Sequence, residues 1–165
     1  MLRLAAVLIA ALTLSTAACA EPAPAPAPAP AGVEKVSFRT TPLVIETSAG
    51  PQRLTVEVAE TPEQRERGLM YREAMAADAG MIFNYHQDQR ISMWMENTIL
   101  PLDMVFIRAD GTVYGIAIGA VPFSRDLISS GEPVRAVLEV NAGTVDRLGI
   151  KPGDKVRHEI FGSAP

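Results

Sequence analysis

Apolar and polar residues alternate over short stretches along most of the chain after position 43. In the segment 54–58, Leu54, Val56 and Val58 alternate with Thr55 and Glu57, which is the period-2 pattern of a strand with one buried face. Patterns of this kind predict strands at 43–47, 54–58, 81–83, 91–95, 102–107, 112–118, 134–140 and 155–160. The first two are separated by turn-forming residues and form a predicted hairpin.

Two short helices interrupt the strands. Thr61 can cap a helix that begins at Pro62, with Gln64 three residues after the cap in the arrangement of a capping box. The segment 141–148 is a second short helical candidate, and Gly149 follows it as a stop signal.

The connections are short and carry turn residues. Asp110-Gly111 is the signal for a two-residue hairpin, and the polar segment 85–90 and the segment 122–131 are predicted loops. Short strands without alternating β-α-β units indicate a mostly β domain, an antiparallel sandwich or small jelly-roll-like barrel with two short helices.

The first 32 residues do not follow this pattern. Residues 1–20 contain Arg3, an apolar run from Leu4 to Leu14 and then small residues, the order found in a secretory signal peptide. Residues 21–32 are rich in Pro and Ala, and such a composition predicts a semi-rigid linker. We therefore expect an exported protein, periplasmic in location, whose single β-rich domain spans 33–165.

Cys19 is the only cysteine of the chain, so no intramolecular disulfide is available. The segment 16–19, Thr-Ala-Ala-Cys, is similar to a lipobox, in which the cysteine becomes lipidated and tethers the protein to a membrane. The alternative is ordinary cleavage after Ala20, which fits a signal-peptidase site of the A-x-A kind and removes the cysteine. A lipid at Cys19 is the only membrane attachment that we expect.

The charges exclude one class of partner. The formal net charge is −4 and no basic run occurs, so nucleic-acid binding is not expected. Phosphate-binding loops and zinc-ligand spacings are also missing from the sequence, and we expect no cofactor and no metal ligands.

Six short motifs occur in a fixed order from residue 68 to residue 154. They are Gly68-Leu69-Met70-x-Arg72, Gly80-Met81-x-Phe83, Trp94-Met95-x-Asn97-Thr98, Pro101-Leu102-Asp103-x-x-Phe106, Leu138-Glu139-Val140-Asn141-Ala142-Gly143 and Gly153-Asp154. Together they resemble the bacterial and archaeal family called domain of unknown function 192. The resemblance covers about residues 54–160 and implies a compact β-sandwich or jelly-roll-like fold, often behind a signal peptide. It implies no established activity.

The only tryptophan has unusual neighbours. Strand geometry places Trp94 on the face of 91–95 opposite to Met93 and Met95, beside polar residues, where an indole can form the floor of a binding cleft. The candidate ligand-binding residues are side chains with polar groups that lie within predicted apolar strands or next to them. They are Arg72, Trp94, Asn97, Asp103, Glu139 and Asn141. The alternative for each is a structural role, as a turn cap or as an ion pair of Arg72 with one of the acids.

Three functions stay open at this point. The first is a non-catalytic module that binds a small molecule or another component of the cell envelope, with no catalytic residue assigned. The second is a hydrolase that uses Asp103 and Glu139 as a pair of carboxylates. The third is a copper-binding protein, because six methionines lie between residues 70 and 104 and thioethers select Cu(I). Core packing is the interpretation that we favour for these methionines, because strand alternation places them beside other apolar residues.

Overall fold

The computed structural model describes residues 36–165 of the chain. The predicted signal peptide, the predicted linker and Cys19 lie outside the described residues. Within 36–165, no helix has the length and apolar character that crossing a membrane requires.

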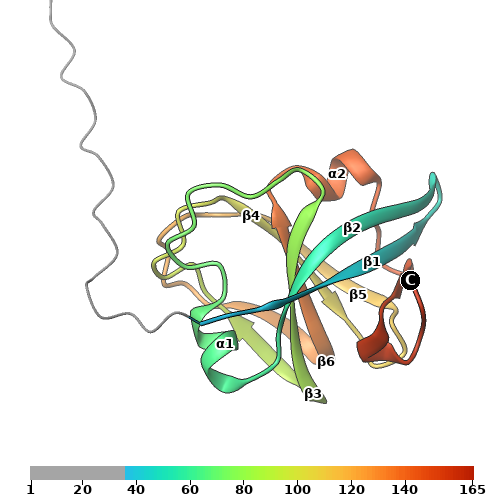
Figure 1. The fold of residues 1–165 in the computed structure, drawn as a ribbon, viewed down its shortest axis with the longest axis horizontal. Helices are drawn as coiled ribbons and strands as arrows, with labels where there is room; N and C mark the ends of the chain where they lie inside the picture. The colour runs from blue at the N-terminus through green and yellow to red at the C-terminus, as the bar shows by residue number, and fades with distance from the viewer. Residues whose placement is uncertain (1–35) are drawn as a thin grey trace, which may run out of the picture. The chain divides into compact units, whose positions relative to one another are not determined.

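The domain is built on one seven-stranded sheet that curls into a half-barrel, with two short helices at its ends (Figure 1). In chain order the elements are β1 (Arg39–Thr47), β2 (Gly50–Ala59), α1 (Pro62–Arg67), β3 (Ala79–Met93), β4 (Leu102–Ile107), β5 (Val113–Ala120), β6 (Ile128–Asn141), α2 (Thr144–Leu148), β7 (Lys155–Arg157) and a 3₁₀ turn (Glu159–Phe161). The mostly β prediction with two short helices is confirmed. Of the two architectures left open, the single curled sheet corresponds to the small barrel.

The strands lie in the order β5-β4-β6-β3-β2-β1-β7. All neighbours are antiparallel except β2 and β3, which run parallel, so the prediction of a purely antiparallel sheet is wrong at this one pairing. A parallel pair needs a crossover between its strands. Here the crossover is the segment 60–78, which begins with α1 and places it beside one face of the sheet.

The central strands are buried on both faces. Ile82, Val105 and Leu138 belong to one apolar cluster, which packs under α2 and β7. The second apolar cluster consists of residues on the opposite face of the sheet, among them Phe83 and Met104. A strand buried on both sides needs apolar residues at nearly every position, and all six residues of β4 are buried.

β3 is one strand of 15 residues, although the sequence predicts two strands with a loop between them. The polar segment that was expected to form the loop continues the strand, and its register against β6 is interrupted between Asn84 and Gln89. His86 lies there in the left-handed region, with φ 61°. An irregularity of this kind bends a strand without ending it, so both halves of β3 pair with β6.

The two outermost strands of the sheet meet at one end of the half-barrel. Gly111 accepts a hydrogen bond from Val156 N at 2.8 Å, and Val113 N donates to Asp154 O at 2.9 Å. A Cβ on Gly111 would lie 2.5 Å from Val156 O, so this approach requires glycine. Asp110-Gly111 lies in the connection 108–112 of an antiparallel β4–β5 hairpin, so the hairpin prediction is confirmed but its turn is longer than the two residues expected. β7 is also shorter than predicted, because the chain enters the 3₁₀ turn after three residues.

Candidate functional site

Glu139 is a carboxyl group placed inside an apolar layer. It lies near the C-terminal end of β6 and faces the second apolar cluster, with Met81 of β3 and Met104 of β4 as its cross-strand neighbours. The residue is only 4% exposed. Its carboxyl oxygens have no hydrogen-bond partner within 36–165, and removal from water raises the pKa of Glu139 to about 8.

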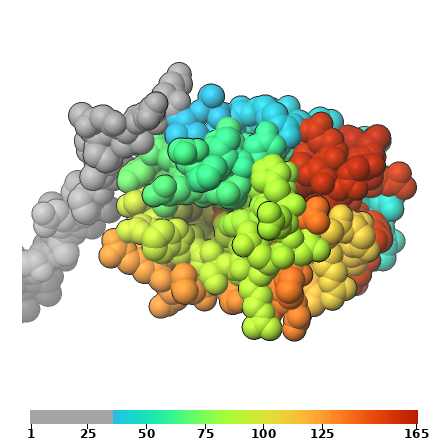
Figure 2. Space-filling view, turned by 90° about the horizontal axis from the view of Figure 1, so that it is seen from below, coloured from blue at the N-terminus to red at the C-terminus, as the bar shows by residue number. Residues whose placement is uncertain are grey.

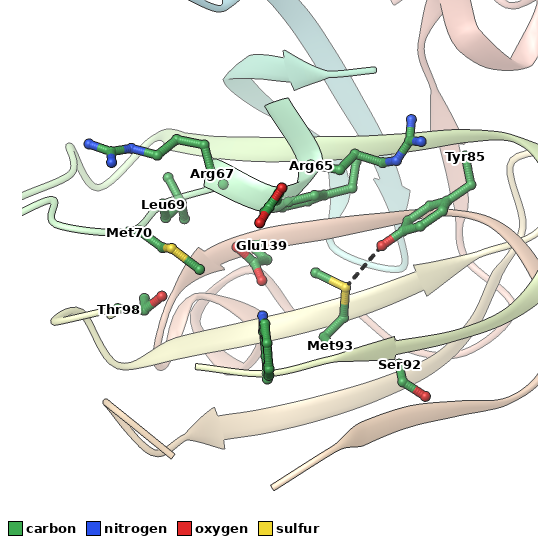
Figure 3. Close-up of a pocket in the computed structure, with 13 residues that line it drawn as sticks. Arg65, Arg67, Leu69, Met70, Tyr85, Ser92, Met93, Thr98 and Glu139 are labelled. Carbon is green, nitrogen blue, oxygen red and sulfur yellow. Dashed lines mark hydrogen bonds between the residues drawn. The ribbon is translucent and has the colours of Figure 1, made fainter. Parts of the chain in front are cut away.

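The carboxyl group opens into a pocket. In the described part of the chain, every side-chain nitrogen or oxygen that is sealed from solvent has a hydrogen-bond partner. The unpaired oxygens of Glu139 must therefore meet open space, and the residue lines a cavity of about 80 Å³. Figure 3 shows its side chain between Met70 and Met93, and Figure 2 shows a hollow beneath the green segment that includes α1.

Three parts of the chain form the pocket. Residues 65–70 come from α1 and the turn after it, residues 83–98 come from β3 and the loop that follows, and β6 contributes Glu139. The complete lining is Arg65, Glu66, Arg67, Gly68, Leu69, Met70, Phe83, Tyr85, Ser92, Met93, Trp94, Thr98 and Glu139. The lining is mixed, with aromatic and thioether groups beside several charged and polar side chains.

Local chemistry fixes α1 above the sheet. Thr61 and Gln64 form the predicted capping box, and the helix ends at Gly68. A Cβ on Gly68 would lie 3.0 Å from the ring of Phe83, so glycine allows the end of α1 to settle on β3. Arg65 then donates from Nη1 to two backbone carbonyl oxygens, one of them that of Asn84 at 3.0 Å. These contacts connect α1 to β3 and give the pocket its roof.

The two arginines of the lining do not neutralise Glu139. The guanidinium of Arg65 is held by backbone carbonyls and lies over the ring of Tyr85, 5.1 Å from its centroid. Arg67 lies over Tyr71, 4.7 Å from that ring's centroid. In Figure 3 both guanidinium groups point away from Glu139. No positive charge therefore offsets the burial of the carboxyl group, which agrees with the single cause of its raised pKa.

Trp94 forms the outer wall of the pocket. The alternation predicted for this segment is observed, since Met93 and Met95 are buried while Trp94 is 45% exposed. A wider and shallower groove of about 480 Å³ adjoins the pocket on its solvent side. The two hollows share Glu66, Arg67, Met70 and Trp94. Trp94 therefore lies where the groove and the pocket adjoin.

Backbone strain is concentrated around the groove. Tyr71, Asn97 and Phe123 have φ values of 63°, 55° and 62°, in the left-handed region that non-glycine residues seldom occupy. Tyr71 N donates to Asn97 O at 2.9 Å, and Phe123 N donates to the neighbouring Thr98 O at 3.2 Å. Strained residues persist where surrounding contacts hold them, and they cluster at functional sites.

The structure brings two of the six candidate residues into the pocket, Trp94 and Glu139. Asn97 lines the adjoining groove, and its side-chain amide lies 3.9 Å from the sulfur of Met70. Asn141 belongs to neither hollow and donates to the backbone oxygens of Met75 and Ala76.

Arg72 and Asp103 have partners elsewhere. Arg72 forms an ion pair with Glu57, so its suggested pairing with Asp103 or Glu139 is wrong. Asp103 accepts hydrogen bonds from Gly119 N at 2.9 Å and Val145 N at 3.1 Å, and it connects β4 to β5 and to α2.

The two acids of the hydrolase hypothesis lie on opposite faces of the sheet. Glu139 pairs with Met104 in the register of β4 and β6, and Asp103 is the residue that precedes Met104 on β4. Successive side chains of a strand point to opposite faces. The structure therefore does not bring these carboxyl groups to one site.

Two of the six clustered methionines reach the pocket. The hydroxyl of Tyr85 donates to the sulfur of Met93 at 3.4 Å, and Met70 lines both hollows. Met81, Met95 and Met104 are fully buried in the second apolar cluster, against which Met75 packs. Residues 36–165 contain no group of three or more His, Cys, Asp or Glu side chains arranged to hold a metal ion.

Sequence reasoning missed the roof of the pocket. The capping box located α1, but nothing in the sequence placed Arg65 and Arg67 beside Trp94 and Glu139. That neighbourhood depends on the parallel crossover. The only available signal was the pair of motifs around Gly68 and Glu139, whose order carries no distance information.

Two crystal structures are similar to this chain. A Sinorhizobium meliloti protein, provisionally described as a transcription regulator, is 49% identical with a TM-score of 0.74, and the match covers 77% of this chain and 99% of that one. A protein of unknown function from Novosphingobium aromaticivorans is 34% identical with a TM-score of 0.71, over 76% and 95% of the two chains. No protein of curated function matches at a significant level.

The family model of domain of unknown function 192 (DUF192), described as "Uncharacterized ACR", matches residues 44–158. The match covers the sheet from β1 to β7 and includes every lining residue of the pocket. This chain belongs to the DUF192 family.

Proposed function

We propose that the domain is a non-catalytic module that binds a small molecule in the pocket between α1 and the sheet. The observation that carries this proposal is the unpaired carboxyl group of Glu139 at the pocket floor. A carboxyl group buried without a partner destabilises the fold. A bound molecule that pairs with it would remove this cost.

The surroundings of Glu139 support binding more than catalysis. An enzyme that works with paired carboxyl groups needs both on one site, and Asp103 is committed to two backbone N–H groups on the other face. The walls offer apolar contact through Phe83 and Trp94. A buried carboxyl group beside such apolar walls can orient a ligand.

Export belongs to the same proposal. The order of charge, apolar run and small residues in 1–20 supports secretion to the periplasm. The segment ending at Cys19 supports a lipid tether. Labelling of cells with a radioactive or clickable fatty acid should mark the wild-type protein and leave Cys19→Ser unmarked. If the wild-type protein is not labelled, the proposal of a lipid tether is refuted, whereas the proposal of export is unaffected.

Nucleic acid is not the proposed partner, although the Sinorhizobium relative is described as a regulator of transcription. The chain is acidic overall, with a formal net charge of −4. The groove beside Trp94 contains three glutamates and one arginine. Such a surface repels a phosphate backbone.

The binding proposal can be tested with the protein's own fluorophore. Trp94 is the only tryptophan, so a molecule in the pocket should change its emission. A panel of amines, amides, carboxylates and sugars is titrated while emission and melting temperature are recorded. Trp94→Ala should abolish the stabilisation by any hit. Leu127→Ala, which truncates a more exposed apolar residue outside both hollows, should retain it. Hits that stabilise Trp94→Ala as well as wild type would refute the pocket as the binding site.

A further inference from the structure

We propose that the ligand of this pocket carries an organic cation, whose ammonium group pairs with the carboxyl of Glu139 between the aromatic walls. This inference rests on the proposed binding function and specifies its chemistry. It stands on the cavity, the buried carboxyl, the aromatic lining and the charge of the groove.

The charge along the path to Glu139 favours a cation. Four acids line the two hollows, Glu63, Glu66, Glu96 and Glu139, against two arginines. Arg65 is engaged with backbone carbonyls and Tyr85, and Arg67 lies over Tyr71. Of the acids in the hollows, Glu96 alone forms an ion pair within the described residues, with Arg125. The outer groove therefore has an excess of negative charge, whereas the inner pocket, lined by Arg65, Arg67 and Glu66, becomes electrically balanced only when Glu139 ionises.

The walls are of the kind that stabilises ammonium groups. Phe83 and Trp94 line the inner pocket together with Tyr85, whose ring already has the Arg65 guanidinium over one face. The faces of aromatic rings attract a cation through their quadrupoles, and this attraction strengthens when the cation is removed from water. The sulfurs of Met70 and Met93 are polarizable neighbours without positive charge. A volume of about 80 Å³ admits an ammonium group with part of an alkyl chain and leaves the rest in the groove.

Binding of a cation must change the protonation of Glu139. The titratable or charged groups facing it are Arg65, Glu66 and Arg67 from α1 and its end, and Tyr85 from β3. None of them hydrogen-bonds to Glu139, whose pKa of about 8 leaves the free pocket mostly protonated at neutral pH. An ammonium group favours the carboxylate form, so complex formation at pH 7 should release about one proton.

The test uses three compounds of equal chain length, n-butylammonium, butyramide and butyrate, in calorimetric titrations of the full chain. Only n-butylammonium should bind well. Its affinity should rise about tenfold per pH unit between pH 6 and 7 and level off above pH 8, since below the pKa each unit of pH changes the ionised fraction about tenfold. Titrations in buffers of different ionisation enthalpy should report the released proton.

Two variants make the test specific. Glu139→Gln keeps the size of the side chain and removes the charge, and it should weaken n-butylammonium binding at pH 8 at least tenfold. Glu132→Gln makes the same change at an exposed position of the same strand and should leave binding unchanged. Circular dichroism confirms that both variants are folded.

The outcomes separate the two proposals. If butyramide or butyrate binds and this binding depends on Trp94, the binding function is supported and the proposal that the ligand is a cation is overturned. Silver(I) binding through the two pocket methionines, with no response to n-butylammonium, would overturn it in favour of a soft metal ion. A lack of n-butylammonium binding, or equal binding to Glu139→Gln, would also overturn it.

Discussion

Replacing Glu139 by glutamine should stabilise the protein by an amount that depends on pH. Glutamine has nearly the same shape as protonated glutamate but never ionises. In the wild type, the pKa of Glu139 is about 8 in the folded state and returns to 4.5 in the unfolded chain. The folded state therefore holds a proton that the unfolded chain has lost at every pH between these values.

The sign and size follow from this difference. A raised pKa in the folded state contributes stability below pH 4.5, and this stability is lost as the pH rises through 8. At about 1.4 kcal/mol per pH unit, the free energy of unfolding of the wild type should fall by about 3 kcal/mol at pH 7 and about 5 kcal/mol at pH 9. Glu139→Gln should not show this loss, so its advantage should grow from pH 4.5 upward.

Urea unfolding followed by circular dichroism at pH 4.5, 6, 7, 8 and 9 measures the difference directly. Other titrating groups affect both proteins equally and cancel. Glu132→Gln, on an exposed part of β6, should follow the wild type at every pH. A difference between Glu139→Gln and wild type that stays constant with pH would refute the assignment of Glu139 as a buried, unpaired acid.

Three further changes test the frame around the pocket. Asp103→Asn should lower the free energy of unfolding by about 2–3 kcal/mol, because two backbone N–H groups lose a charged acceptor; a loss below 0.5 kcal/mol in urea would contradict this role. Gly111→Ala should lower the melting temperature far more than Gly119→Ala, since only the first places a Cβ against Val156 O while both have positive φ; equal melting temperatures would disprove the close approach. Burial lowers the pKa of His158, so the free energy of unfolding should fall as the pH drops from 6.5, the value in the unfolded chain, through the lower folded pKa. Urea unfolding of His158→Gln should lack this part of the acid-induced loss.

The strands and helices could be predicted because their signals are local. Alternating side chains in β2, the capping box at Thr61 and the stop at Gly149 each act over a few residues. The parallel pairing of β2 with β3 could not be predicted, because it depends on a crossover of some twenty residues. The continuity of β3 was missed for a related reason: the irregular register at His86 tolerates a polar sequence that otherwise indicates a loop.

The site was predictable only in part. Strand periodicity correctly placed Trp94 on the face opposite to Met93 and Met95, and the sequence also showed that Glu139 has apolar neighbours on both sides. Asp103 has the same kind of apolar neighbours, yet the direction of its side chain gives it two hydrogen bonds and gives Glu139 none. That difference depends on which face of the sheet carries α2, and no short pattern contains this information. The partner of Arg72 was missed because Glu57 lies on a strand that reaches it only in the folded chain.

Because β7 contacts the loop before β5, residues 155–165 connect the two outermost strands of the sheet. They occupy the free side of β1, and Val156 N donates to Gly111 O in the loop just before β5. A protease cut or a premature stop just before Lys155 would uncover strand edges at both margins of the sheet at once. Uncovered edges recruit other chains, so such a shortened protein should accumulate as aggregate even with its pocket residues all present.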